Sequence, residues 1–321
     1  MVKTSDLSVM LFPWGNESPS VSDTVAAAQL AEELGFHSVT LPTHMTLPPG
    51  WLFTDFTNED CLDSLVIVPA IAQATSRIKI GFNSVLLPVL PPYQWAKYLS
   101  TLDVMSDGRL IVGAAMGWWE EDFKSLGVNQ KKRGKLFDEQ LEILTRLWTE
   151  ERVTFHGEQY TLDDMPMQPK PVQTPHPPIW IGGGPMSIWR AAKYGEYLLA
   201  FWPDEEAARN TWCPKLAEEG AKYGRDPKLA AFTFVYVADD EADLATQADR
   251  LETAVGFEGG DVSVADVTVA GSPQQCADKL NSLQDAGVSH FVLEFQFHGL
   301  ETVEFGMNQM RKFSEQVVPL L

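Results

Sequence analysis

The sequence predicts an α/β fold, a single-domain (β/α)₈ TIM barrel that spans residues 1–321. Short apolar stretches with strand character alternate with amphipathic helical stretches eight times along the chain. The first connections are short, as in parallel βαβ units. Glycines and unusual polar residues follow the expected strands, where barrel enzymes carry their sites. A doubly wound open sheet is the alternative, but it rarely needs eight such units in series.

The first half of the chain predicts four strand–helix units. Strands are expected at residues 7–12, 38–41, 77–82 and from 109 onward, and helices at 21–34, 62–74, 91–105 and 133–149. In the last of these helices, Phe137, Leu141 and Leu144 recur at the spacing of one helical face. Gly35 follows the first helix, at a position where glycine commonly ends a helix.

The second half begins with an insertion, expected to be irregular, at about residues 150–178. Six prolines between Pro166 and Pro178 exclude a helix interior or a central strand there. The alternation then resumes, so the insertion is predicted to lie within the single domain. Strands are expected at 179–181, 196–201, 229–237 and 289–297, with helices at about 188–192, 204–223, 241–255, 273–286 and up to 318, and no assignment for 257–271.

The composition narrows the function class. With 24 Lys plus Arg against 44 Asp plus Glu, the net charge is −20, which argues against nucleic acid and membrane surfaces as partners. Cys61, Cys213 and Cys276 lack metal-ligand spacing, as does every pair of histidines, so no metal is expected. Free thiols without a targeting segment or a long apolar run predict a cytoplasmic protein. We therefore expect a small-molecule enzyme.

Candidate site residues follow four consecutive strands. His44 follows the second strand and could donate a proton or a hydrogen bond. Gly182, Gly183 and Gly184 precede a helix, where backbone N–H groups and the helix dipole favour a phosphate. The alternative is a tight turn that binds no ligand. The remaining candidates at strand ends are Asn83, Ser84, Val85, Gly113, Met116, Gly117 and Ser187.

Aromatic residues suggest an apolar substrate. The loop at residues 42–60 is long and aromatic, which is typical of a loop that lines a pocket. The basic run Lys131–Arg133 could hold an anionic cofactor tail, but a solvated helix start is the favoured interpretation. The residues expected to contact substrate are Trp14, Trp51, Phe53, Phe56 and Trp118.

Several motifs, in order, resemble the bacterial luciferase-like family of flavin and deazaflavin oxidoreductases. They are L-D-V-M-S-D-G-R-L-I-V-G-A-A-M-G-W-W-E-E-D-F, F-H-G-E-Q-Y, P-K-P-V-Q-T-P-H-P-P-I-W-I-G-G-G and V-A-G-S-P-Q-Q-C-A-D-K-L. The resemblance covers nearly the whole chain. It implies a barrel that binds a flavin-type ring at the strand C-termini, with a bulge, often with a cis peptide, at Ser84–Val85. It also implies phosphate binding at Gly182–Gly184 and Ser187, a place for His44 near the ring, and pairing into a homodimer.

Two branches of this family compete. One transfers hydride with coenzyme F420, and the other uses reduced FMN from a separate reductase to activate oxygen. The form G-x-x-x-G-W-W-x-E-x-F resembles the first, and Met116 replaces an arginine common in the second. We therefore expect F420-dependent hydride transfer to or from a small apolar molecule. An FMN-dependent two-component monooxygenase, a flavin-binding protein without turnover and a non-flavin barrel such as a lyase are the alternatives.

The residue before His44 departs from the family pattern. Thr43 stands where the family commonly has aspartate. Without that carboxylate, the orientation of the His44 ring is expected to be less controlled.

Overall fold

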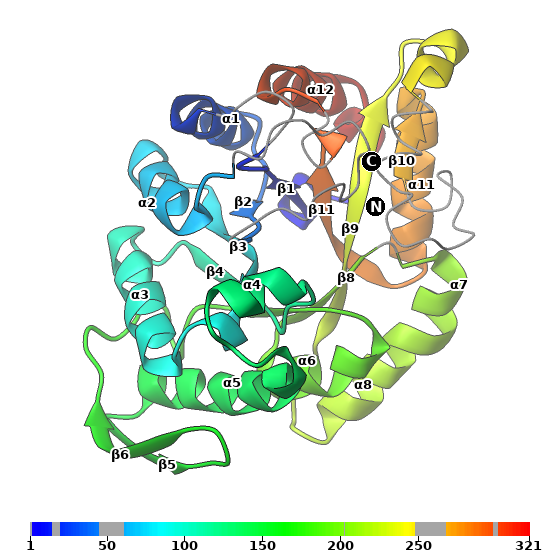
Figure 1. Ribbon diagram of the computed structural model, residues 1–321. Coiled ribbons are helices and arrows are strands. Elements are labelled where there is room, and N and C mark those ends of the chain that lie inside the picture. The colour runs from blue at the N-terminus through cyan, green and yellow to red at the C-terminus, as the bar shows by residue number, and fades with distance from the viewer. Residues whose placement is uncertain (1, 15–19, 45–60, 202, 248–267, 298–300) are drawn as a thin grey trace.

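The computed structural model describes residues 2–14, 20–44, 61–201, 203–247, 268–297 and 301–321. Within these ranges, eight parallel strands close into a barrel, and the helices form a ring around them (Figure 1). The predicted TIM barrel is therefore confirmed. In spatial order the barrel strands are β1 (Leu7–Met10), β2 (Ser38–Leu41), β3 (Lys79–Leu86), β4 (Leu110–Ala115), β7 (Ile179–Gly182), β8 (Tyr197–Phe201), β9 (Lys228–Val237) and β11 (Val288–Glu294).

Strand pairing fixes which side chains face the barrel interior. Alternate residues of a strand point to opposite faces. One set therefore fills the interior, and the other packs beneath the helices. The interior cluster includes Met10, Ile111, Trp180, Leu199, Phe232, Phe234 and Val292, whereas Leu7, Val9, Val39, Ile80, Val112 and Ile181 belong to the helix-facing cluster.

The helices bury one apolar face each and end at recognisable caps. Ser20 accepts the backbone N–H of Asp23 at the start of the first helix, and Ser272 and Gln275 form a capping box. The helices are α1 (Val21–Glu33), α2 (Ser64–Ala74), α3 (Pro92–Met105), α4 (Glu120–Ser125), α5 (Arg133–Thr149), α6 (Ile188–Tyr194), α7 (Glu205–Ala207), α8 (Cys213–Ala221), α11 (Pro273–Asp285) and α12 (Val303–Gln316). None of these helices has the length and apolarity needed to cross a bilayer in the described parts of the chain.

The expected helix at 204–223 is interrupted. A π-helical turn at Ala208–Trp212 separates α7 from α8. Pro214 stands in the first turn of α8 and has no N–H to donate into the preceding turn. A continuous α-helical hydrogen-bond pattern is therefore broken at this point.

The insertion is more regular than predicted. Its first half forms an antiparallel hairpin, β5 (Arg152–His156) and β6 (Thr161–Pro166), which lies outside α5 in Figure 1. Residues 167–178, all of them described, contain no helix or strand, as their prolines require. The buried carboxylate of Asp103 on α3 holds this segment by accepting the backbone N–H groups of Val172 and Gln173, at 2.7 and 3.0 Å.

The stretch without an assignment contains one further strand. β10 (Thr268–Gly271) pairs in parallel with the carboxyl-terminal end of β9. Residues 241–247 are helical, as expected, and the remainder of the predicted helix at 241–255 lies outside the described residues.

Candidate functional site

The centre of the candidate site is an irregularity in β3. The pairing between β3 and β4 shifts register between Phe82 and Val85, and the Asn83–Ser84 peptide bond is cis. The bulge expected at Ser84–Val85 therefore lies one residue earlier. Val85 is already back in register with Ala114, and its fully buried side chain packs in the helix-facing cluster.

Two predicted glycines are required by this bulge. A Cβ on Gly113 would lie 2.0 Å from the backbone oxygen of Phe82, and a Cβ on Gly182 would lie 2.8 Å from Oγ of Ser84. Both distances are shorter than any van der Waals contact allows. The structure therefore brings together Asn83, Ser84, Gly113 and Gly182 as a wall of backbone and small side chains at the carboxyl ends of β3, β4 and β7.

The two other glycines after β7 differ in the space around them. Gly183 has a φ of +143°, which favours glycine, and a Cβ there would meet Oγ of Ser187 at 2.6 Å. A Cβ on Gly184, by contrast, would meet no atom of the described residues within 4 Å. Ser187 immediately precedes α6 and is buried. This loop is a cradle that could accept an anionic group at Gly184.

The segment that carries His44 is anchored at each residue. Oγ of Ser64 donates to the carbonyl of Pro42 at 2.5 Å, and Oγ1 of Thr43 donates to the carbonyl of Ser84 at 2.8 Å. Sγ of Cys61 lies 3.7 Å from the carbonyl oxygen of His44. Burial raises the pKa of the Cys61 thiol to about 12, so this group stays protonated and can donate. Thr43 thus ties the His44 segment to the β3 bulge.

The ring of His44 meets a carboxylate that was not predicted. Nδ1 of His44 lies 2.9 Å from Oδ2 of Asp122 on α4, and the side chains are 11% and 0% exposed. The expectation that the ring lacks control without an aspartate at position 43 is therefore wrong. The carboxylate comes instead from a residue 78 positions away, because α4 packs back over the strand ends.

Aromatic rings flank His44. Trp14 and Trp118 both lie edge-on to the imidazole, with ring centroids 6.0 and 6.4 Å away. Trp14 is buried, whereas Trp118 is 45% exposed. The structure thus brings these two predicted substrate contacts to His44. Trp51, Phe53 and Phe56 lie outside the described residues.

The end of β4 departs from an ordinary strand at the predicted positions. Gly117 has a φ of +75°, and a Cβ there would lie 2.9 Å from the ring of Phe123. Met116 is partly buried and packs against the helix-facing cluster. The position at which one branch of the resembled family commonly has an arginine therefore carries an apolar side chain with apolar neighbours.

One further polar residue at the strand ends was not predicted. Glu294 ends β11 in register with Met10, and its fully buried carboxylate accepts the backbone N–H of Gln296 at 2.5 Å. The acidic residue at the end of the run V-S-H-F-V-L-E was the available signal, since a charge after an apolar strand marks its carboxyl end.

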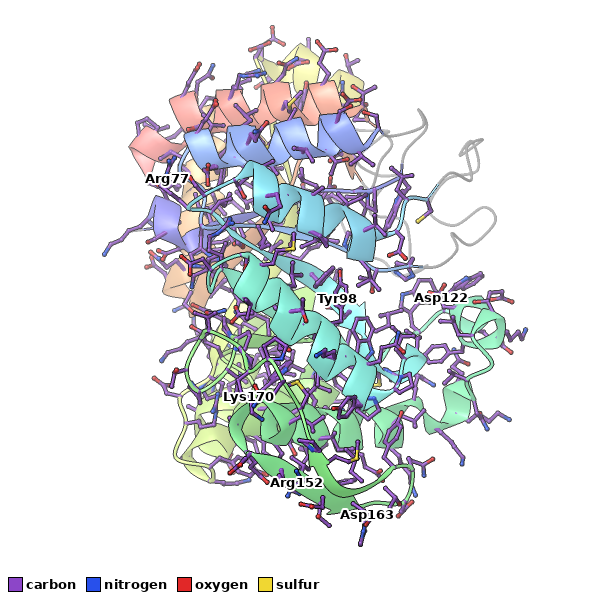
Figure 2. All side chains as sticks on the ribbon, turned by 90° about the vertical axis from the view of Figure 1, so that its left-hand side faces the viewer. Arg77, Tyr98, Asp122, Arg152, Asp163 and Lys170 are labelled. Carbon is purple, nitrogen blue, oxygen red and sulfur yellow. The ribbon has the colours of Figure 1, made fainter. Side chains whose placement is uncertain are left out.

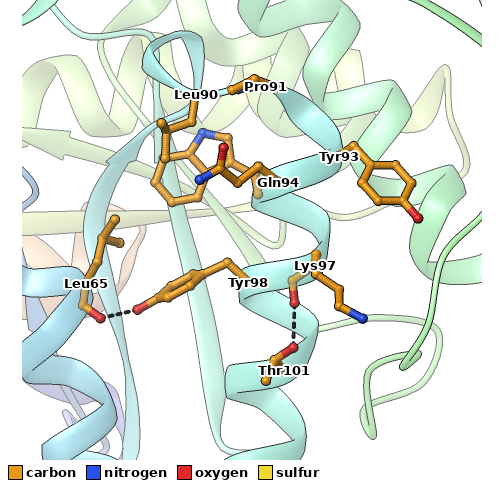
Figure 3. Close-up of a pocket in the computed structure, with 9 residues that line it drawn as sticks. Leu65, Leu90, Pro91, Tyr93, Gln94, Lys97, Tyr98 and Thr101 are labelled. Carbon is orange, nitrogen blue, oxygen red and sulfur yellow. Dashed lines mark hydrogen bonds between the residues drawn. The ribbon is translucent and has the colours of Figure 1, made fainter. Parts of the chain in front are cut away.

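A surface groove of about 570 Å³ lies elsewhere, in the helical layer between α2 and α3 (Figure 3). Tyr98 on α3 donates to the carbonyl of Leu65 on α2 beside this groove, as Figure 3 shows. The apolar lining of the groove does not include the residues around the β3 bulge. Those residues lie at the carboxyl ends of the strands, where barrel enzymes carry their sites. Within the described ranges, no group of three or more His, Cys, Asp or Glu side chains could hold a metal ion.

Comparison with known proteins shows which family has this arrangement. Residues 8–259 match the family model described as luciferase-like monooxygenase. The chain belongs to this family. It is 26% identical over 331 residues to an FMNH₂-dependent dimethylsulfone monooxygenase of Pseudomonas putida, an alignment that covers 92% of this chain and 86% of that protein.

Solved structures of the same fold include a monooxygenase and an F420-dependent dehydrogenase. The monooxygenase RslO1 from Streptomyces bottropensis superposes with a TM-score of 0.82 at 23% identity, covering 98% of this chain and 99% of that one. An F420-dependent secondary alcohol dehydrogenase, solved with an F420–acetone adduct, superposes with a TM-score of 0.79 at 20% identity, covering 99% of both chains. This luciferase-like protein is therefore a flavin or deazaflavin oxidoreductase by family.

Proposed function

We propose that this luciferase-like protein transfers hydride between coenzyme F420 and a small apolar organic molecule. The observation that carries the proposal is the wall formed by the Asn83–Ser84 bulge, Gly113 and Gly182. At the carboxyl ends of three strands, this wall presents backbone atoms and small side chains to a cofactor with a flat ring. Met116 also favours the deazaflavin over FMN, since it stands where the FMN-dependent branch of the family commonly has an arginine.

The residues of the wall and cradle fit such a cofactor. Asn83, Ser84 and the backbone of Val85 would support the ring, with Gly113, Met116 and Gly117 beside it. Gly182–Gly184 and Ser187 would hold the phosphate, with room at Gly184. When bound, F420 supplies the hydride chemistry. The chain contributes position and the exclusion of water.

The aromatic residues and His44 would face the substrate. Trp14 and Trp118 flank the imidazole at the strand ends and provide apolar contact area. The sequence also predicts substrate contacts for Trp51, Phe53 and Phe56, which lie outside the described residues. His44 would accept or donate a proton or a hydrogen bond at the reacting group.

Cofactor titration tests the proposal. We expect purified apoprotein to bind F420 in a fluorescence-quenching titration, and to bind oxidised or reduced FMN at least about tenfold more weakly, a difference of about 1.4 kcal/mol. Tight binding of FMN together with no binding of F420 would contradict it. Gly184→Ala is the matched variant: it should weaken F420 binding, since the added methyl occupies the open part of the cradle, while the fold is retained.

The second candidate is an FMN-dependent two-component monooxygenase. The similarity to a dimethylsulfone monooxygenase that depends on FMNH₂ favours it. It would require a separate flavin reductase as partner, whereas the F420 reaction could draw on a deazaflavin reductase. Substrate-dependent oxygen consumption with chemically reduced FMN would support this candidate. We further propose that two copies pair, which light scattering of the purified protein tests.

A further inference from the structure

Asp122 is a buried carboxylate in an otherwise exposed acidic turn. α4 begins with three consecutive acids, Glu120, Glu121 and Asp122. The side chains of Glu120 and Glu121 are 59% and 48% exposed, and both pair with Lys124 at the surface. Asp122 is fully buried on the other side of the helix. Figure 2 shows it at the opposite end of the barrel from Arg77, which precedes β3.

A buried carboxylate is costly unless it is hydrogen-bonded, so the contacts of Asp122 are informative. Its Oδ2 lies 2.9 Å from Nδ1 of His44, well within the range of a charge-assisted hydrogen bond. An ionised carboxylate can only accept. Nδ1 of His44 must then carry a proton, and in the neutral ring this leaves a lone pair on Nε2.

We propose that Asp122 is a positioning residue that fixes His44 in the tautomer with the proton on Nδ1. The anchored backbone sets the place of His44 through Thr43 and Cys61, and Asp122 sets the rotation of its ring and the location of its proton. A neutral His44 then presents Nε2 as an acceptor. It can take a hydrogen bond or a proton from a bound molecule but cannot give one.

A proton fixed on Nδ1 limits neutral His44 to the role of an acceptor at Nε2. What this means for the reaction rests on the proposed function. A reacting group that meets His44 at Nε2 must therefore carry an O–H or N–H. The assignment of the tautomer itself concerns the chain alone. It can therefore be tested without cofactor or substrate, and its failure is separate from a failure of the F420 titration.

Nitrogen NMR of the imidazole provides the test. Apoprotein labelled with ¹⁵N-histidine has six histidines, and His44→Gln identifies the signals of His44. When the ring is neutral, we expect Nδ1 to have the ¹⁵N chemical shift of a protonated nitrogen. Nε2 should have the ¹⁵N chemical shift of a nitrogen with a lone pair. In Asp122→Ala the ratio of the Nδ1–H to the Nε2–H form should fall by about tenfold or more, as expected for the loss of a hydrogen bond to a charged group.

Two further variants complete the experiment. Glu121→Gln removes a charge from the same helical turn at an exposed position, and the ratio should stay at its wild-type value. Asp122→Asn keeps the shape of the side chain, and its amide can donate to Nδ1, so it should also raise the Nε2–H form. A wild-type protein with the proton on Nε2 overturns the proposal whether or not the variants fold. An unchanged ratio in folded Asp122→Ala or Asp122→Asn also overturns it.

Discussion

Gly113 and Gly184 belong to the same candidate site, but the surrounding atoms differ at the two positions. At Gly113 the backbone of β3 approaches so closely that a Cβ would lie 2.0 Å from the carbonyl oxygen of Phe82. At Gly184 no atom from the part of the chain that the structure describes lies within 4 Å of such a Cβ. The first glycine is therefore needed for folding, whereas the second leaves room that a ligand can use.

Alanine substitutions should separate these two roles. We expect Gly113→Ala to lower the free energy of unfolding by about 3 kcal/mol, because a backbone carbonyl must move. Gly184→Ala should change it by less than about 1 kcal/mol. Urea denaturation of both variants measures the difference. A Gly113→Ala protein as stable as the wild type would show that β3 and β4 can separate at no cost.

At the scale of elements, a side chain of α5 holds the turn of the β5–β6 hairpin. The carboxylate of Glu139 accepts the backbone N–H groups of Glu158, Gln159 and Tyr160 at 2.8 to 3.1 Å. The neighbouring ion pair between Lys135 and Glu158 is exposed, and such pairs contribute little. The attachment of the hairpin turn therefore depends on Glu139.

Removing this carboxylate should release the turn locally. In Glu139→Ala we expect amide hydrogen exchange at residues 158–160 to accelerate by about tenfold or more, since each lost bond to a charged group contributes about 1.5–3 kcal/mol. The barrel strands should exchange at their wild-type rates. Lys135→Ala is the control and should leave exchange in the turn nearly unchanged. Equal exchange in Glu139→Ala and the wild type would contradict this account.

At the scale of the whole molecule, closure of the barrel buries a polar cluster at the amino ends of its strands. Oγ of Ser8 on β1 lies 2.7 Å from Nε2 of His290 on β11 and 2.6 Å from Oγ of Ser38 on β2. The ring centroids of His37 and His290 lie 4.9 Å apart. Burial lowers the pKa of His290 well below its usual value. Burial, with Lys79 as the next cause, lowers the pKa of His37 to about 4.

These shifts predict a loss of stability in mild acid. Folded His37 stays neutral down to about pH 4, whereas in the unfolded chain it is protonated below about pH 6.5. Unfolding thus takes up a proton in this window, so stability falls as pH decreases from about 6.5 to about 4 and does not depend on His37 above it. The complete effect is about 3 kcal/mol.

Denaturation across this pH range tests the prediction. His37→Gln should reduce the slope of unfolding free energy against pH by up to about 1.4 kcal/mol per pH unit, the value for one proton. His156→Gln, at an exposed position of the hairpin, is the control substitution. If the slope in His37→Gln equals that of the wild type, burial does not keep His37 neutral in the folded protein.

Much of the fold follows from local pattern. Apolar periodicity, capping residues and prolines predicted the order of the strands and helices, and even the bounds of α5, because these signals act within a few residues of the chain. The hairpin at β5 and β6 was missed, since its strands are short and largely exposed and so lack a strong apolar alternation. The π-helical turn before Pro214 was missed because a single proline is found both in the first turn of a helix and at a break between two helices.

The sequence by itself determined the barrel, the strand ends at which a site would form and the family to which the chain belongs. Tertiary structure alone decided that the bulge lies at Asn83–Ser84, that Thr43 supports it and that Asp122 meets His44. The reason is physical. Periodicity reports which face of an element is buried, but the partner of a buried polar group is chosen by packing between residues distant in the chain. The acidic run before Phe123 does not reveal which of its three carboxylates turns inward.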